Sequence, residues 1–327
     1  MNLIEVEGLT KHFPVRTGFF SRAKRAVHAV DGVDLSIKRG ITLGLVGESG
    51  CGKTTFGRLL LRLLEPTQGH IRFEDHDICK LTSREMQKVR PHMQMIFQNP
   101  NASLNPRKTV RQILSLPFKI HTKYSQEEII ENIMNLMRMV ELTPPKTYLD
   151  RHPHEFSGGQ RQRIVIARAI ALSPKFVVAD EPVASLDLSV RAGILNLMQN
   201  LTEKFGITYL YITHDLNVIR FISQRLAVMY LGKIVELAEA ETIYKEPLHP
   251  YTEALLSSTP IPNPRKAQNL KRIILKGDVP SSIDIPTGCR FHTRCPHRFA
   301  PCNSYEPELV NVGKDHFVAC HLRAEGM

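Results

Sequence analysis

The chain has 327 residues, of which 42% are hydrophobic and 23% are charged. This length suits about two domains, and the composition excludes a disordered or fibrous chain. The formal net charge of +11 would permit nucleic-acid binding, but Lys and Arg are scattered, and the one short cluster, Arg22, Lys24 and Arg25, is interpreted as a solvated loop.

The amino-terminal stretch MNLIEVEGLTKHF does not combine a basic region with an apolar one, as a signal peptide does. No run of about 18 apolar residues suits a membrane-spanning helix. We therefore expect the chain to stay in the cytosol and not to cross a membrane by itself. Free thiols are the rule there, so the six cysteines argue against a disulfide framework.

A glycine-rich loop, GESGCGKTT, lies between an apolar stretch (41–46) and the stretch FGRLLLRLL (56–64), predicted as a strand and a helix. In this setting G-x-x-x-x-G-K-[ST] binds phosphate through backbone N–H groups and the helix N-terminus. Lys53 adds a full positive charge, and Thr54 offers a hydroxyl to Mg²⁺. The predicted nucleotide loop consists of Gly47, Glu48, Ser49, Gly50, Cys51, Gly52, Lys53, Thr54 and Thr55.

Polar side chains follow three further apolar stretches predicted as strands. Asp180 and Glu181 come directly after FVVA, where an aspartate can hold Mg²⁺ and a glutamate can polarise an attacking water. Without the glycine loop, this pair would read equally well as an acidic turn. Gln98 follows QMIF, and His214 follows ITYLYI and Thr213, so we expect these side chains at the same edge of a parallel sheet.

A helix is predicted over 125–140, SQEEIIENIMNLMRMV, because Ser125 and Glu128 form a capping-box pattern. Its apolar side chains recur on one helical face: Ile129, Ile133, Leu136, Met137 and Val140. The methionines in this stretch are interpreted as gap-filling core residues. The preceding stretch NPNASLNPR (99–107) is predicted to be a loop that could serve as a docking surface.

The motif SGGQ opens a continuous segment that runs to Leu172. The order of the glycine loop, Gln98, SGGQ, Asp180–Glu181, Ser185–Asp187 and His214 resembles the ATP-binding-cassette (ABC) ATPases over roughly residues 1 to 250. In that family SGGQ caps a helix that faces the γ-phosphate of ATP held by another cassette. The physics agrees, because bare glycine backbone at a helix N-terminus attracts anions and a serine adds a donor.

The resemblance implies a role for each matching residue. Phosphate binding falls to Lys53 and the backbone of Gly50 and Gly52, whereas Mg²⁺ is held or sensed by Thr54, Gln98 and Asp180. The catalytic residues are Glu181 as general base, His214 as γ-phosphate switch, and Gln98. The residues implied to act across a dimer are Ser157, Gly158, Gly159, Gln160 and Asp187.

Three further positions bear on the resemblance. Phe13, in LTKHF, stands where the family places an aromatic side chain that stacks on adenine, although a core phenylalanine remains an alternative. Phe156 replaces the leucine usual before the signature, and Ser185 replaces an alanine in the following loop. Neither departure removes a charge or a nucleophile, so we expect a working site.

The carboxy-terminal stretch LHPYTEALLSSTPIPNP (248–264) resembles the extension found in ATPases of oligopeptide and dipeptide importers. A proline-rich linker follows, and then four cysteines that favour a metal over disulfides in a cytosolic chain: Cys289, Cys295, Cys302 and Cys320. They resemble the four-cysteine [4Fe–4S] motif of this transporter branch, with zinc or unliganded thiols as alternatives. Arg290, Arg294, His297 and Arg298 are expected to lower the thiol pKa values.

We therefore predict an α/β P-loop cassette (1–247) with a RecA-like core, an antiparallel β lobe and an inserted helical subdomain (about 99–172). A cysteine-rich extension (248–327) follows. The resemblance implies an ATPase that powers uptake of di- and oligopeptides from the cytoplasmic side of the cell membrane, as a peripheral subunit. Its expected partners are a second homologous ATPase in a heterodimer, two membrane permease subunits and an external solute-binding protein.

Alternatives remain at this stage. Related importers carry nickel or oligosaccharides, and a homodimer could replace the heterodimer. Soluble ABC ATPases act on DNA or ribosomes, but they usually carry long coiled coils or two cassettes, neither of which is present, so no nucleic acid is expected as a partner. A nucleotide-sensing regulator is disfavoured, because Glu181 and His214 are both retained.

Overall fold

A computed structural model describes residues 1–15, 25–259 and 272–324. Arg22, Lys24 and most of the predicted proline-rich linker therefore lie outside the described residues. The chain divides into two compact units. The first comprises Met1, 38–41 and 80–210, and the second comprises 2–37, 42–79 and 211–327.

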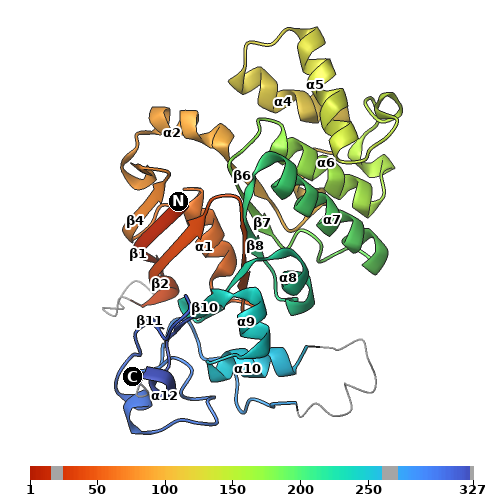
Figure 1. Cartoon of the computed structure of the whole chain (residues 1–327). Coiled ribbons are helices and arrows are strands. Elements are labelled where there is room, and N and C mark those ends of the chain that lie inside the picture. Colours follow the sequence, from red (N-terminus) through yellow and green to blue (C-terminus); the bar gives the residue numbers. More distant parts are fainter. Residues whose placement is uncertain (16–24, 260–271, 325–327) are drawn as a thin grey trace. The chain divides into compact units, whose positions relative to one another are not determined.

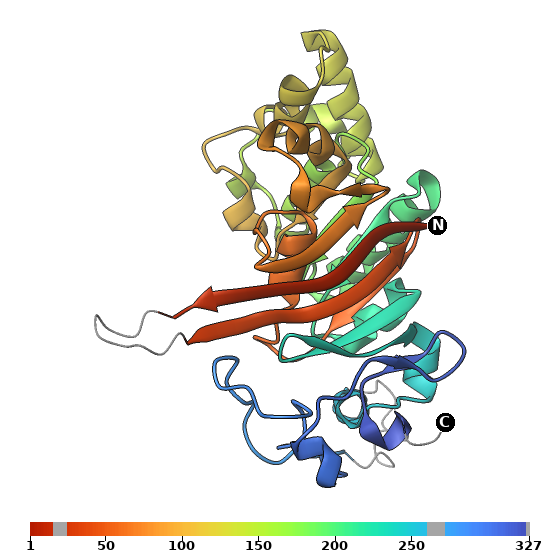
Figure 2. The same cartoon turned by 90° about the vertical axis from the view of Figure 1, so that its left-hand side faces the viewer.

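The second unit contains an antiparallel lobe of the predicted kind. Its four-stranded sheet has the order β2-β1-β4-β5, and Figure 2 shows β1 and β2 as long neighbouring strands. Strand β1 pairs antiparallel with β4 and places Leu3, Ile4 and Leu9 in the core. The strands of this sheet are β1 (Asn2–Pro14), β2 (Ala26–Lys38), β4 (Gln68–Phe73) and β5 (His76–Asp77).

A second set of strands in this unit has the order β11-β12-β10-β9-β3. Strand β3 pairs parallel with β9, while β9 and β10 pair antiparallel. Every residue of β3 is buried, and β3 confirms the strand predicted within 41–46. The set consists of β3 (Thr42–Val46), β9 (Arg225–Tyr230), β10 (Lys233–Glu239), β11 (Val310–Asn311) and β12 (Phe317–Val318).

Within this unit, a buried carboxylate connects β10 to the chain after residue 247, which is called the carboxy-terminal segment below. The side chain of Glu236 is fully buried and accepts hydrogen bonds from the backbone N–H groups of Leu248 and His249 and from His316 Nε2, at 2.8–3.0 Å. Burial raises the pKa of Glu236, but these donors outweigh it and hold the pKa below its usual value. The helices of the unit are α1 (Lys53–Leu60), α8 (Leu216–Ile222), α9 (Ala240–Lys245), α10 (Pro250–Ser257) and α12 (His321–Ala324).

In the first unit, strands follow the order β8-β7-β6, and β6 pairs parallel with β7. All residues of β7 are buried, which confirms the strand predicted at FVVA. The chain passes to the second unit within β8, after Leu210. The strands are β6 (Met93–Ile96), β7 (Phe176–Asp180) and β8 (Thr208–Ile212).

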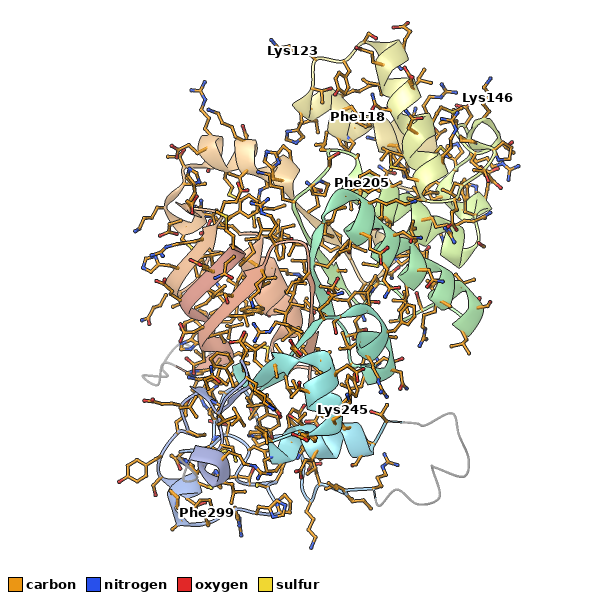
Figure 3. All side chains as sticks on the ribbon, in the orientation of Figure 1. Phe118, Lys123, Lys146, Phe205, Lys245 and Phe299 are labelled. Carbon is orange, nitrogen blue, oxygen red and sulfur yellow. The ribbon has the colours of Figure 1, made fainter. Side chains whose placement is uncertain are left out.

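The first unit is rich in helices, and Figure 1 labels its longer ones. They are α2 (Ser83–Val89), α3 (Pro100–Ser103), α4 (Val110–His121), α5 (Gln126–Met139), α6 (Gly158–Ile170) and α7 (Leu188–Phe205). Phe118 of α4, labelled in Figure 3, is 3% exposed and belongs to the core of this unit. None of the described helices combines the length and the hydropathy needed to cross a bilayer.

The predicted helix at 125–140 is confirmed as α5, with its capping box and its predicted apolar face buried. One detail of that prediction is wrong, because Met139 is 41% exposed and fills no core gap. The stretch NPNASLNPR is also not wholly a loop. Asn99 accepts hydrogen bonds from the N–H groups of Asn101 and Ala102 and so starts the short helix α3.

Candidate functional site

The glycine loop of the second unit follows β3 and leads into α1. Gly52 precedes the helix at φ +110°, and a Cβ there would lie 2.0 Å from the carbonyl oxygen of Ala29, so only glycine fits. The Lys53 side chain is 7% exposed, and its Nζ donates to the carbonyls of Gly47 (2.7 Å) and Glu48 (2.9 Å). A buried ammonium group is thus held over the loop, at the start of a helix.

Two residues of the carboxy-terminal segment hold this loop. Arg294 donates two hydrogen bonds to the carboxylate of Glu48, Nη1 to Oε2 at 2.7 Å and Nη2 to Oε1 at 3.0 Å. The backbone N–H of Glu48 donates to the hydroxyl of Tyr251 at 2.8 Å. Neither contact was predicted, because 203 and 246 positions of sequence separate the partners and no local pattern indicates such a pairing.

In the first unit, Gln98 and Glu181 meet as predicted. Gln98 Nε2 donates to Glu181 Oε2 at 2.8 Å, across 83 positions of sequence. Asp180, at the end of β7, is 3% exposed. Glu181 has φ +45°, in the left-handed region that a non-glycine residue seldom adopts. Such backbone conformations are frequent at functional sites. In this conformation the Glu181 carboxylate accepts the hydrogen bond from Gln98.

The SGGQ motif begins helix α6, as predicted. Ser157 Oγ accepts from the N–H of Gln160 at 3.3 Å, and Gln160 Oε1 accepts from the N–H of Ser157 at 3.0 Å. The serine oxygen acts here as an acceptor, so its hydroxyl proton can still be donated to a ligand. A Cβ on Gly159 would lie 2.4 Å from Val190 Cγ1. The absence of a side chain at Gly159 therefore allows the motif to pack closely against α7.

Asp187 begins helix α7. Its Oδ1 accepts from the N–H of Val190 at 2.9 Å and from Ser189 Oγ at 2.8 Å. These hydrogen bonds, led by that from the Val190 N–H, lower the pKa of Asp187. The SGGQ motif and the loop that ends at Asp187 are therefore neighbours in one unit, through Gly159 and Val190.

Phe13 and His214 belong to the second unit, with the glycine loop. Phe13 is half-buried, and Lys11 Nζ lies 5.1 Å from the centroid of its ring. His214 is exposed and follows β8 after Thr213. Their assigned roles on adenine and on the γ-phosphate stay predictions.

The four carboxy-terminal cysteines are free thiols. Burial raises the pKa of Cys289 to about 11 and raises those of Cys295 and Cys320, and charge on the neighbouring thiols of the group raises all three further. The backbone N–H of Cys289 donates to the carbonyl of Cys302 at 2.9 Å. The main chains at Cys289 and Cys302 thus lie side by side, whereas no three of the four described thiols have all their sulfur atoms within 4.8 Å of one another.

The expectation that basic neighbours lower these pKa values is wrong for the three thiols. The guanidinium of Arg294 binds Glu48, and that of Arg290 binds Asp31 and the carbonyl of Leu231. Both cations are thus satisfied elsewhere, and desolvation of the thiols dominates.

Within the described residues, one group of three possible metal ligands has its ligand atoms within 4.8 Å of one another: His12, His28 and Asp31. Asp31 accepts from His12 Nε2 at 3.0 Å and from Arg290. Burial raises the pKa of Asp31, but these partners outweigh it and lower the pKa to about 2. The carboxylate already has a guanidinium partner, so this group is explained as a polar link between β2 and the carboxy-terminal segment.

Two family models match parts of this chain. A family model described as "ABC transporter" covers residues 30–184, and one described as "Oligopeptide/dipeptide transporter, C-terminal region" covers residues 235–302. The oligopeptide transport ATP-binding protein AppF of Bacillus subtilis is 51% identical, over 98% of this chain and 97% of its own length. The probable peptide ABC transporter ATP-binding protein y4tS of Sinorhizobium fredii is 45% identical, over 98% of this chain and 90% of its own length.

Among solved structures, a dimeric ATP-binding cassette in a post-hydrolysis state, bound to ADP and Pi, has a TM-score of 0.64 and 29% sequence identity. The similarity covers 72% of this chain and 98% of that one. A cbiO1 protein from Clostridium perfringens, part of a cbiONQ transporter complex, has the same TM-score at 26% identity, over 75% of this chain and 91% of that one.

Proposed function

Because this chain belongs to the ABC transporter family and carries the C-terminal region of oligopeptide and dipeptide transporters, we propose that it hydrolyses ATP to power the import of peptides. The observation that carries this proposal is the glycine loop, in which buried Lys53 and the N-terminus of α1 converge on backbone shaped by glycine. Such a loop binds the phosphates of a nucleotide.

In the proposed reaction, Glu181 orients a water molecule for attack on the γ-phosphorus of ATP. A bond forms between the water oxygen and phosphorus, the bond to the β–γ bridging oxygen breaks, ADP leaves, and Glu181 accepts a proton. The hydrogen bond from Gln98 fixes the carboxylate of Glu181 for this task. Bound Mg²⁺ would neutralise phosphate charge, held by Thr54, Asp180 and Gln98.

We further propose that hydrolysis needs two cassettes. The helix N-terminus at Ser157–Gln160 offers an anion-binding surface in a 13-residue helix, with a serine proton available for donation. In the proposal this surface contacts the γ-phosphate bound by a second, homologous ATPase, and Asp187 lies at the same junction. Phe13 stacks on adenine, and His214 contacts the γ-phosphate. ATP closes the pair and hydrolysis reopens it.

The proposed assembly is a peripheral complex on the cytoplasmic face of the membrane. A peptide-importer ATPase implies membrane permease partners, and we propose two such subunits, a heterodimeric ATPase pair and an external solute-binding protein. The division into a cassette (1–247), with a helical subdomain at about 99–172, and an extension (248–327) also belongs to the proposal.

We propose that Cys289, Cys295, Cys302 and Cys320 hold a [4Fe–4S] cluster. Support comes from the ligand count and from the backbone hydrogen bond that joins Cys289 to Cys302. Anaerobic purification, an absorption spectrum, and iron and sulfide assays test this part. An iron-free preparation that contains zinc would replace the cluster by zinc and leave the ATPase assignment standing.

The ATPase assignment is tested with Lys53→Ala. Without the ammonium group, binding of MgATP to the full chain should be lost, because phosphate charge is then unopposed at the loop. Glu181→Gln should bind MgATP normally and fail to hydrolyse it. Tight MgATP binding by Lys53→Ala would overturn the proposal.

A further inference from the structure

The carboxy-terminal segment contacts the glycine loop at Glu48, the second residue of the loop. The proposed ATPase reaction assigns no role to this contact. Glu48 engages three partners through three different groups. Its carboxylate binds Arg294, its N–H donates to Tyr251, and its carbonyl accepts from Lys53 Nζ. Two of the partners come from the segment after residue 247, and the third is the phosphate-binding lysine.

The contact is built into the interior. The side chain of Arg294 is 8% exposed and that of Glu48 is 27% exposed. Tyr251 is fully buried and packs against Tyr230 and Phe291, with ring centroids 4.7 and 5.4 Å apart. Bidentate Arg–carboxylate pairs fix orientation as well as charge. Arg294 is therefore held by the fold, and it fixes the Glu48 peptide in turn.

The pair also matters for charge. A carboxylate at the second position of a phosphate loop would repel the triphosphate. This repulsion is stronger in a partly buried site than in water, because the effective dielectric constant is lower. Arg294 neutralises that carboxylate through two hydrogen bonds and so removes the repulsion. In addition, it fixes the carbonyl that orients Lys53.

We propose that Arg294 is a positioning residue for ATP binding, which sets the glycine loop through Glu48 and makes nucleotide affinity depend on the segment that carries Cys289 and Cys295. The inference rests on the proposed function, because it takes Gly47–Thr55 as the ATP phosphate loop. Arg294 itself touches no reacting atom. Its effect should therefore fall on affinity and KM rather than on kcat.

The test measures the Kd of the full chain for MgATP by calorimetry, together with KM and kcat of the assembled transporter. Arg294→Met leaves an unpaired carboxylate beside the phosphates and should raise both Kd and KM roughly tenfold, with kcat within about twofold. Arg294→Lys should recover part of the loss, because an ammonium group restores the charge but not the two-bond geometry.

The decisive variant is the double change Arg294→Met with Glu48→Gln. Removing the carboxylate as well abolishes the repulsion but does not restore the lost positioning, so the double variant should bind MgATP about threefold more tightly than Arg294→Met alone and less tightly than the unmodified chain. If Arg294 only holds the cysteine segment together, the double variant will bind as poorly as Arg294→Met alone. That outcome overturns the inference.

Arg25→Met is the control, because Arg25 is also paired with a carboxylate: its Nη2 donates to both oxygens of Asp284, at 2.6 and 2.8 Å, in an exposed pair that does not include a residue of the glycine loop. It should leave Kd unchanged. Equal Kd values for Arg294→Met and Arg25→Met overturn the inference. If Lys53→Ala abolishes MgATP binding in the same series, the proposed ATPase function is supported even when the inference about Arg294 fails.

Discussion

Gln98 Nε2 lies 2.8 Å from Glu181 Oε2, and this hydrogen bond connects the end of β6 to the strained residue after β7. An amide that donates to a carboxylate fixes its direction without removing its charge. The contact also makes the position of Glu181 sensitive to whatever moves Gln98. Catalysis and the stretch that follows β6 are therefore connected through one side-chain pair.

Glu181→Gln should reduce kcat by roughly 10²–10⁴-fold, the usual contribution of a general base. Gln98→Ala should have a smaller effect, because the carboxylate remains but loses its orienting donor. Glu181→Gln should keep the Kd for MgATP measured by calorimetry. Undiminished steady hydrolysis by Glu181→Gln would exclude Glu181 as the base.

Gly159→Ala should destabilise the chain by about 1–3 kcal/mol, because the added Cβ meets Val190 Cγ1 at 2.4 Å and a β-branched side chain has little freedom to yield. Gly158→Ala is the matched control, since its Cβ would meet Leu186 at an ordinary 3.5 Å. Urea unfolding measures both free energies. Equal losses in the two variants would show that the contact with Val190 is not tight.

Asp31→Asn should remove a pH-dependent part of stability. The pKa of Asp31 is about 2 in the folded chain, below the unfolded value of 3.8, so its contribution is present above pH 4 and is lost as the pH falls toward 2. The side chain is 23% exposed, so we expect about 1–2 kcal/mol after solvent screening.

Urea unfolding of both chains at pH 6 and pH 3 tests this expectation. The unmodified chain should lose more stability on acidification than Asp31→Asn does. Identical pH profiles would mean that the links of Asp31 to Arg290 and His12 contribute nothing to the folded state.

Glu236→Gln should cost about 2–4 kcal/mol of unfolding free energy, because a fully buried hydrogen-bonded anion is replaced by a group that accepts fewer bonds. Glu241→Gln serves as the comparison. Its partners, Arg220 at 3.6 Å and Lys245 at 3.7 Å, are exposed, so its loss should change the unfolding free energy by less than about 0.5 kcal/mol. A Glu236→Gln chain as stable as Glu241→Gln would contradict the assignment of Glu236 as an anchor.

Local patterns sufficed for the strands and helices that carry the motifs. FVVA has the unbroken apolar run of a buried strand, and Ser125 with Glu128 has the spacing of a capping box, so each needed only its neighbours in sequence. The short helix α3 was not predicted, because Asn99 can begin a helix as well as a turn. The exposure of Met139 was not predicted either, because the apolar character of a side chain does not reveal whether it lies on the exposed face of a helix.

Charge partners could not be inferred in the same way. The residues beside the cysteines were expected to act on the thiols, yet Arg290 and Arg294 bind carboxylates more than 240 positions away. Sequence places a guanidinium beside a thiol along the chain, but the side chain is long enough to turn to a distant acceptor. Long-range pairs of this kind depend on the tertiary fold, which no local pattern encodes.

The claim that each nucleotide is held by two cassettes is tested most directly by ATP hydrolysis of the full chain titrated with its partner cassette. The specific activity should rise as the two associate, and replacing Ser157 with Arg should abolish it without loss of MgATP binding. Full-rate hydrolysis by a chain shown to be monomeric during turnover, unaffected by Ser157→Arg, would contradict the account.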